Sequence, residues 1–583
     1  MSESQINNLE QNIAKYFFRA SATDLKKIPG SPIAYWISEK IASVFSSSKS
    51  FEDIGKTRRG LQTGDAGRFV RAWYEVEKCS IGFDLTKKMA EKSGCKWFPF
   101  NSGGSFRKWY GNIEEVVNWM ADGVDIKATG KAIIPSESLY FQQAITWPKV
   151  SSGVCSFRWF PDGVIPGDAG PCYYDESGQM EEILCFSNSK VALSFLKFLS
   201  PTLNFEVGVM AKMPIIIPSQ GSLKKIFQEA VSMHQKDWNA SENSFDFHEF
   251  LLLTPTHRQA TIKASYQKLR AYWREMTLKM QGLEQENNRI FIDTYGLQAE
   301  LTPEVPLKEI TLTCNPHYRY GGDKSEEEFE TMLLADTMRE LVSYAVGCMF
   351  GRYSLDKPGL ILANQGETLA DYLAQVPQPS FPADDDNVIP LLDGDWFPDD
   401  ITLRFRQFLR VAFGDAHYED NLAFIEQALN VKGKRNFSLR DYFLGEFYTD
   451  HVKRYKKRPI YWLFSSPKGT FSALVYLHRY RPDTVSVVLS YLRDFRKKLA
   501  SRLDYLQQVA INPSSSQSEK TKASKEADAI KKQLIELDDY ERDTLYPLAT
   551  EQVELDLDDG VKVNYLKLGS ALKKIVGLEA KED

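Results

Sequence analysis

Residues 106–110 (Phe-Arg-Lys-Trp-Tyr) place two cations among three aromatic rings, directly after the glycine pair Gly103 and Gly104. Cations neutralise phosphates and release counterions, aromatic rings offer faces on which bases stack, and glycines let a backbone come close to a ligand. The segment therefore predicts a nucleic-acid surface. An alternative of about equal weight is that the rings belong to the core and the two cations extend along them to solvent.

Further cations recur near aromatic and small polar residues between positions 51 and 220. Arginine and glutamine can read base edges, whereas lysine and serine are better suited to phosphates. A second basic cluster follows position 451, although such a run is more typical of a solvated helix end than of a DNA clamp. The candidate DNA-binding residues are Gln62, Thr63, Arg68, Arg71, Arg107, Lys108, Trp109, Tyr110, Lys149, Ser151, Ser152, Arg158, Lys453, Arg454, Lys456, Lys457 and Arg458.

No catalytic, cofactor or metal site is predicted from the sequence. Residues 315–318 (Asn-Pro-His-Tyr) differ at the third position from the Asn-Pro-Pro-Tyr motif that grips a flipped adenine in amino-group methyltransferases. The chain has no Gly-x-Gly-x-x-Gly segment for a nucleotide-like cofactor, and its seven histidines lack metal-ligand spacing. Its seven cysteines are odd in number and include no Cys-x-x-Cys pair, which argues against a zinc site or a disulfide framework.

Composition and charge set limits on the kind of protein. The 583 residues suggest roughly three to four domains. The net charge of -6 means that a DNA-binding face must be local, because the molecule as a whole is repelled by phosphate. No apolar run approaches the ~18 residues needed to cross a bilayer, so we expect a soluble, cytoplasmic protein without a membrane partner.

The sequence pattern predicts an α+β protein built from five consecutive segments. Residues 1–50 suggest a helical connector and 51–220 a mixed domain in which short apolar segments alternate with glycine and proline. Residues 221–376 suggest a helical domain and 377–400 an acidic, proline-rich and solvated connector. Residues 401–583 are expected to form a helical C-terminal domain.

Three patterns inside the helical regions predict specific elements. Apolar residues at steps of three and four between Ile262 and Leu283 predict a helix with a packing seam. Long helical segments near 484–511 and 519–546 are expected to form an antiparallel hairpin. Alternating apolar residues around Asp559 and Gly560 predict a terminal β-hairpin, since Asp-Gly supplies the positive φ of a tight turn.

Several longer runs resemble a known family. An early group is similar to the target-recognition domains of type IIG adenine-specific methyltransferases and of the PglX proteins of bacteriophage exclusion (BREX) systems, and a downstream group favours the PglX family. The early group is Leu61–Asp65 with Arg68 and Phe69, Phe106–Asn112 with Trp119, and Ser200–Phe205. The downstream group is Glu286–Asn288, Tyr295–Leu297, Leu301–Glu304, Phe350–Asp356, His451–Trp462 and Asp558–Tyr565.

The resemblance implies a phage-defence enzyme that binds S-adenosylmethionine, flips an adenine in double-stranded DNA and methylates its N6. The family's catalytic and cofactor motifs are absent here, so the chain looks like the C-terminal half, either a fragment or a separately encoded specificity subunit. The resemblance then implies the N-terminal methyltransferase half, other BREX proteins and phage inhibitors as partners. A different hypothesis is an interaction scaffold with little DNA binding of its own, which the acidic balance and the long helices favour.

Overall fold

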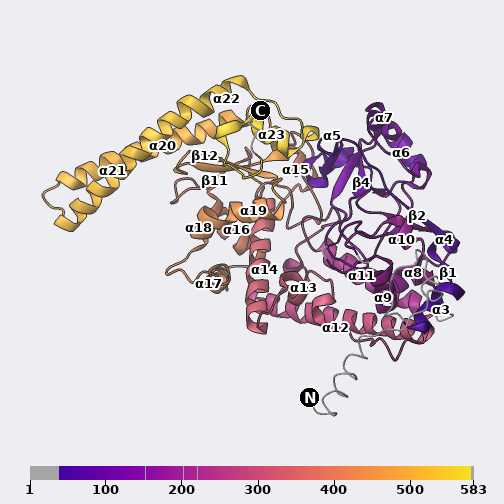
Figure 1. Cartoon of the computed structure of the whole chain (residues 1–583). Coiled ribbons are helices and arrows are strands. Elements are labelled where there is room, and N and C mark those ends of the chain that lie inside the picture. The colour runs from indigo at the N-terminus through magenta and orange to yellow at the C-terminus, as the bar shows by residue number, and fades with distance from the viewer. Residues whose placement is uncertain (1–37, 152, 201, 219–220, 579–583) are drawn as a thin grey trace, which may run out of the picture. The chain divides into compact units, whose positions relative to one another are not determined.

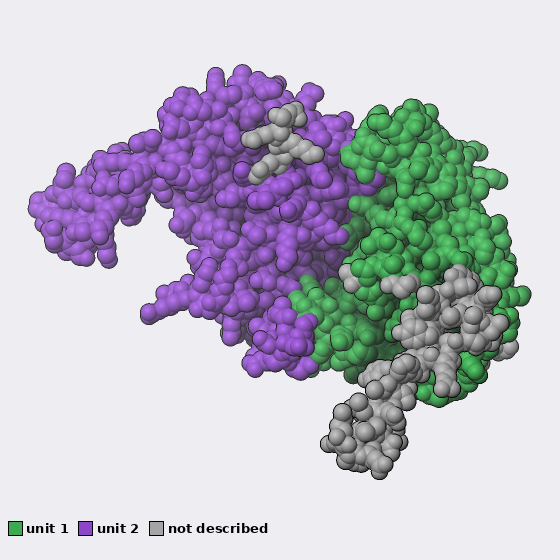
Figure 2. Space-filling model, viewed as in Figure 1, with its two compact units in different colours: residues 1–69, 82–238, 274–321 green, residues 70–81, 239–273, 322–583 purple. Residues whose placement is uncertain are grey.

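The computed structural model describes residues 38–578 except 152, 201, 219 and 220. The chain forms two compact units, coloured separately in Figure 2. Unit 1 comprises residues up to 69, 82–238 and 274–321, and unit 2 comprises 70–81, 239–273 and 322 onward. Because the chain passes between the units several times, this division differs from the five consecutive segments expected from the sequence. Both units mix helices with small sheets, which confirms the α+β class (Figure 1).

Unit 1 is organised around antiparallel strands in the order β2-β9-β6-β7. Their central side chains, among them Ile145 and Tyr173, are fully buried and lie opposite each other in the ladder. A second group places β4 between β5, which is antiparallel to it, and β8, which is parallel. The strands are β1 (Lys49–Ser50), β2 (Gly55–Arg58), β4 (Trp97–Asn101), β5 (Glu115–Asn118), β6 (Ala144–Thr146), β7 (Arg158–Phe160), β8 (Ile165–Pro166), β9 (Cys172–Asp175) and β10 (Pro214–Ile215).

Helices complete unit 1. The longest, α12, has the seam expected from the sequence: Ile262, Leu269 and Met280 are almost completely buried. Residues 262–273 of α12 belong to unit 2 and its remainder to unit 1. The helices are α3 (Glu39–Ser47), α4 (Phe51–Ile54), α5 (Ala66–Phe69), α6 (Lys87–Ser93), α7 (Met120–Ala128), α8 (Met180–Ser187), α9 (Lys190–Leu199), α10 (Val207–Met210), α11 (Ser222–Asn239), α12 (Ile262–Tyr295) and α13 (Pro316–Tyr320).

Unit 2 is mainly helical around a three-stranded antiparallel sheet in the order β11-β13-β12. Its elements are α14 (Glu326–Met349), α15 (Leu369–Gln375), β11 (Val388–Pro390), α16 (Ile401–Phe413), α17 (Tyr418–Leu429), α18 (Leu439–Tyr442), α19 (Tyr448–Arg454), β12 (Tyr461–Ser465), β13 (Ser472–Tyr476), α20 (Thr484–Ile511), α21 (Gln517–Tyr540), α22 (Tyr546–Glu551) and α23 (Val561–Lys567). The pair α20 and α21 is the long helical hairpin expected from the sequence. No helix in the described part of the chain is both long and apolar enough to cross a membrane.

The expected terminal β-hairpin is wrong. Gly560 does adopt the positive φ, +77°, that an Asp-Gly turn needs, but it ends a 3-10 turn and precedes helix α23. The buried apolar residues Leu557, Val561 and Tyr565 recur every four positions. This spacing fits a helix as well as the alternating pattern fits a strand, and the segment forms a helix. Glycine is needed here for a second reason, since a Cβ at this position would lie 2.6 Å from Nε of Arg71.

The solvated connector expected at 377–400 is also wrong. Strand β11 lies in this segment and pairs with β13, and Phe381 and Ile389 are buried. Asp400 caps α16 by accepting a hydrogen bond from the Thr402 N–H and forms an ion pair with Arg440 at 3.0 Å. The acidic residues find partners far away in the sequence, and local composition does not reveal these partners.

Asp384, in the same segment, should make stability depend on pH. Its side chain is buried, and burial together with the nearby charge of Asp386 raises the pKa of Asp384 to about 7. A carboxyl with a raised folded pKa contributes stability below its unfolded pKa and loses that contribution as pH rises through its folded pKa. The unit should therefore melt at a lower temperature at pH 8 than at pH 5. We expect Asp384→Asn to remove this part of the dependence and to raise the melting temperature at pH 8.

Thermal melts at both pH values test this expectation. Asp385→Asn is the matched control because its carboxyl is the exposed neighbour of Asp384. A melting temperature of Asp384→Asn that falls with pH as steeply as that of the unmodified chain contradicts the assignment.

Candidate nucleic-acid interface

Arg107, the first cation of the aromatic segment, is buried in unit 1. Its guanidinium forms an ion pair with Asp237 of α11 at 2.9 Å and donates to the Tyr110 carbonyl at 2.8 Å. It also lies 5.1 Å from the centre of the Trp238 ring. Burial raises the pKa of Asp237, but the charge of Arg107 and hydrogen bonds to the carboxylate outweigh this effect and hold the pKa below its ordinary value. Arg107 therefore fixes its own segment to α11.

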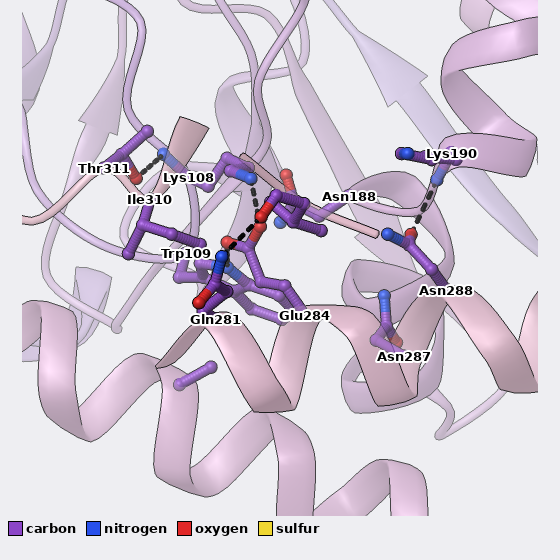
Figure 3. Close-up of polar contacts among 12 residues, drawn as sticks. Lys108, Trp109, Asn188, Lys190, Gln281, Glu284, Asn287, Asn288, Ile310 and Thr311 are labelled. Carbon is purple, nitrogen blue, oxygen red and sulfur yellow. Dashed lines mark hydrogen bonds and ion pairs between the residues drawn. The ribbon is translucent and has the colours of Figure 1, made fainter. Parts of the chain in front are cut away.

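Lys108 and Trp109 are held by one carboxylate on α12 (Figure 3). The Lys108 ammonium forms a buried ion pair with Glu284, and the Trp109 indole N–H donates to Oε1 of the same side chain at 3.0 Å. The Lys108 backbone N–H donates to the Thr311 hydroxyl at 3.0 Å. A charged pair in a buried place is tolerated when further hydrogen bonds satisfy it, and Glu284 meets that condition.

Arg158 is completely buried and donates to the carbonyl oxygens of Gly103 and Arg107 at 2.9 and 3.2 Å. Burial lowers its pKa to about 10. The prediction that Arg107, Lys108, Trp109 and Arg158 contact DNA does not match the structure, because all four side chains lie inside unit 1. Tyr110 is also buried. Neither sequence interpretation was right for the cations, which are buried and pair with internal carboxylates and carbonyls.

Asparagine side chains continue the same arrangement along α12 (Figure 3). Asn288 accepts the Lys190 backbone N–H at 2.9 Å, at the start of α9, and Asn287 donates to the Cys185 carbonyl at 2.8 Å at α8. Helix α12 thus presents a polar edge that binds main-chain groups of several unit 1 segments. The face that contacts residues 106–110 has a structural role.

The candidate cations of unit 2 are partly paired. Arg71 is buried and donates to the Asp558 carbonyl at 3.1 Å, so its predicted DNA contact does not match the structure. In the second basic cluster, Arg454 pairs with Glu242 at 3.3 Å and Arg458 with Glu75 at 2.9 Å. The remaining members, Lys453, Lys456 and Lys457, are exposed.

The other candidates belong to a group of unit 1 loops that we call the loop edge. The loop edge consists of residues 59–65, 131–134, 149–154, 167–169 and 202–204, of which residue 152 is not described. Backbone hydrogen bonds tie these loops together: Gln62 and Ile133 exchange two of 2.9 Å, and the Ser151 N–H donates to the Leu203 carbonyl at 3.0 Å. Loops fixed in this way can present side chains to a ligand in a defined arrangement.

A glycine lets two of these loops meet. The Leu61 N–H donates to the Pro166 carbonyl at 2.7 Å, and the Asp168 N–H donates to the Leu61 carbonyl at 3.1 Å. A Cβ on Gly60 would lie 2.4 Å from the Gly167 carbonyl oxygen. Only a residue without a side chain fits at position 60 without a shift of the backbone.

Asp168 organises the charges of the loop edge. It forms ion pairs with Arg59 and Lys149, each at 3.0 Å. Burial raises the pKa of Asp168, but hydrogen bonds from Gln62, Lys149 and Arg59 outweigh this effect and hold the pKa below its ordinary value. Two cations share this carboxylate, and the Arg59 side chain remains 48% exposed. Glu206 approaches Lys149 to 3.7 Å, so the two carboxylates balance the two cations. The exposed Arg59 side chain nevertheless leaves a cation accessible from solvent.

Apolar side chains stand beside these charges. Val150 and Leu203 are 63% and 55% exposed, and Ile133 is 59% exposed. Of the sequence candidates in this region, Gln62 is half-buried, Thr63 and Ser151 are buried, and Ser152 lies outside the described residues. Arg68 is exposed on α5 and covers the Phe69 ring at 4.8 Å. Arg59 and Asp168 were not among the site residues predicted from the sequence. The adjacent pair Arg58 and Arg59 before Gly60 could have indicated Arg59.

Residues 315–318 do not fit an adenine or a methyl donor. Asn315 is buried and caps α13 by accepting the His317 N–H at 3.2 Å. Its amide group donates to the Leu307 and Ile310 carbonyls, both at 2.8 Å. The carbonyl oxygen, to which an exocyclic amine would donate, already accepts the His317 N–H, and the side chain is buried.

Comparison with known proteins gives two strong matches. Adenine-specific methyltransferase BrxX of Escherichia coli O9:H4 (strain HS) is 35% identical over 98% of this chain, and adenine-specific methyltransferase PglX of Lacticaseibacillus casei (strain Zhang) is 35% identical over 97%. The chain is homologous to part of these methyltransferases. It spans about half the length of these relatives, 47% and 46%. No family model matches the chain.

The similarity to BrxX and PglX confirms the family resemblance inferred from the sequence runs. It covers both compact units, because nearly the whole chain is matched. The position of the matched part as a C-terminal half stays a prediction.

The burial of Arg107 makes a testable prediction. Arg107→Ala leaves the Asp237 carboxylate buried without its cation, so we expect stability to fall by about 3–5 kcal/mol. Denaturant and thermal unfolding measure the loss. In Arg107→Leu/Asp237→Leu, which removes both charges, much of the stability should return.

The matched control is Lys225→Ala, which removes an exposed cation that lies 3.8 Å from Glu229 on the same helix. This variant should change stability by less than about 0.5 kcal/mol. If Arg107→Ala melts like the unmodified chain while its DNA affinity falls, Arg107 is a contact residue and the structural assignment is wrong.

Proposed function

We propose that unit 1 recognises a DNA sequence for adenine-specific methylation and that the loop edge makes the contacts. The proposal depends on one observation: five loops present Arg59, Gln62 and Lys149 beside exposed apolar tips in a chain homologous to adenine-specific methyltransferases. The acidic balance of the chain does not oppose this function, because the charge that matters is local.

The chemistry of the loop edge suits a groove of duplex DNA. Arginine makes paired hydrogen bonds to guanine and glutamine to adenine, while apolar tips contact the thymine methyl group. Lys149 is better suited to a phosphate. Asp168 holds the cations in place before DNA arrives, which reduces the ordering cost of binding.

The methyl-transfer step itself is proposed to belong to the part of BrxX and PglX that this chain does not match. S-adenosylmethionine and the flipped adenine would be bound there, since Asn315 is fully engaged in capping α13. We further propose that this chain acts in the cytoplasm with that methyltransferase part. Other BREX proteins and phage inhibitors are further proposed partners.

Variants of the loop edge test the proposal. Arg59→Ala and Gln62→Ala should each weaken binding to the preferred site by about 1–3 kcal/mol if they read a base, and should relax the sequence preference at one position. Lys149→Ala should weaken binding to all duplexes similarly. The measurement is selection of bound sequences from a random duplex pool, followed by titration of the enriched and random duplexes.

The control is Arg289→Ala on α12, an exposed arginine paired with Glu286 and outside the loop edge. It should leave both affinity and preference unchanged. If none of the loop-edge variants changes the enriched sequence or its affinity, the recognition function is wrong. If the unmodified chain binds no duplex at all, the interaction scaffold becomes the better hypothesis.

A further inference from the structure

The distal part of the hairpin α20–α21 has a charge opposite to that of the chain. Residues 497–532 contain eight basic and four acidic side chains, whereas the whole chain has a net charge of -6. In Figure 1 the two helices extend away from the sheet of unit 2. Most of the buried residues of α20 lie before Leu499, so the far part of the hairpin packs mainly on itself.

Three lysines form a line on one face of α21. Lys522, Lys525 and Lys532 follow one another at steps of three and seven residues, which places them on the same side of the helix. All three are exposed. Ser518 and Ala529 fall on the same face, and their small side chains leave the ammonium groups accessible.

The line continues to the body of unit 2. Glu536, four residues after Lys532, is buried and accepts the backbone N–H of Lys468 at 2.7 Å. It also accepts the Thr470 hydroxyl, so it fixes the turn between β12 and β13 at the end of the lysine line. Lys468 is exposed on that turn. We call Lys468, Lys522, Lys525 and Lys532 the lysine stripe.

Other groups hold most of the carboxylates near the stripe, although the charge of Glu519 interacts with Lys522 and that of Glu536 with Lys468. Glu526, which could pair with Lys522 at i+4, is bound by Arg502 at 2.9 Å. Asp528, near Lys525, is bound by Lys531 at 3.2 Å. Within the part of the chain that the structure describes, no stripe lysine forms an ion pair with a carboxylate. The stripe lysines are therefore exposed and available to bind an anionic partner.

We propose that the lysine stripe binds the phosphate backbone of duplex DNA without reading its sequence. The three stripe lysines of α21 span about 15 Å from Lys522 to Lys532, given a rise of 1.5 Å per residue. A duplex carries one charge per about 1.7 Å along its axis, so a linear array of point charges meets phosphates in any register. Flexible ammonium groups neutralise phosphates but lack the rigid planar fork with which arginine recognises a base.

This inference rests on the proposed function in one respect, namely that the protein acts on DNA. The two contacts differ in what they control. The loop edge determines which sequence is preferred, whereas the stripe raises the affinity for every duplex. Their failures are therefore separable in one set of binding experiments.

The test uses the full chain with Lys522, Lys525 and Lys532 changed to glutamine, which has a helix propensity close to that of lysine. Binding of a random duplex is titrated at several salt concentrations. We expect the slope of log K against log salt to become shallower by about 2 to 3, since each phosphate contact contributes about 0.9. The ratio of affinities for the enriched and random duplexes should stay unchanged.

The matched control carries Lys497→Gln, a lysine of the same hairpin that is paired with Asp494 and lies outside the stripe. Its salt slope should change by less than one contact. An unchanged slope in the triple variant overturns the stripe, as does an absence of random-duplex binding by the unmodified chain. The proposal is also overturned if lysine-rich α21 has no preference for DNA, that is, if the unmodified chain binds poly-glutamate as tightly as it binds duplex DNA. A changed slope without any sequence preference supports the stripe and contradicts the loop edge.

Discussion

Burial of charge is the constraint on which unit 1 depends. Arg107 and Lys108 are adjacent, and each is paired with a carboxylate from a different helix, Asp237 of α11 and Glu284 of α12. Removing a charge from water is costly, and a partner with good geometry offsets the cost. The two pairs therefore fix segment 103–110 against both helices, and Arg158 secures the carbonyl groups of the same segment. Gly103 of this segment also approaches the loop edge, since a Cβ there would lie 2.5 Å from the Ala169 carbonyl oxygen.

The charges at the surface are arranged differently from the buried pairs, because they remain exposed to solvent. At the loop edge, Arg59 and Lys149 are held by Asp168 but stay partly exposed, so their orientation is set without loss of access. On α21, Glu526 and Asp528 form ion pairs with other cations, and the stripe lysines remain exposed. An acidic chain can in this way expose cations in two places. The loop edge has the variety of side chains needed to recognise bases, whereas the lysine stripe has only positive charge, which suits the phosphate backbone of DNA.

Sequence periodicity predicted the long elements and failed where distant partners decide. The seam of α12 and the hairpin α20–α21 follow from local apolar spacing, and both are present. By contrast, Asp237 and Glu284 lie about 130 and 176 residues from the cations they bind, so no local pattern announces them. The same holds for Asp384, which is buried although the composition of its segment is typical of a solvated linker. Near Gly560 the apolar residues fit both an alternating and a helical spacing, and the structure has a helix there because the helical spacing buries them.

Hydrogen exchange of the chain with and without its enriched duplex is the most direct test of the central claim that cations of the loop edge, and not the aromatic segment, face DNA. The account predicts added protection at residues 59–65, 131–134, 149–154, 167–169 and 202–204, with no change at 106–110. Protection concentrated at 106–110, with the loops unaffected, would contradict it.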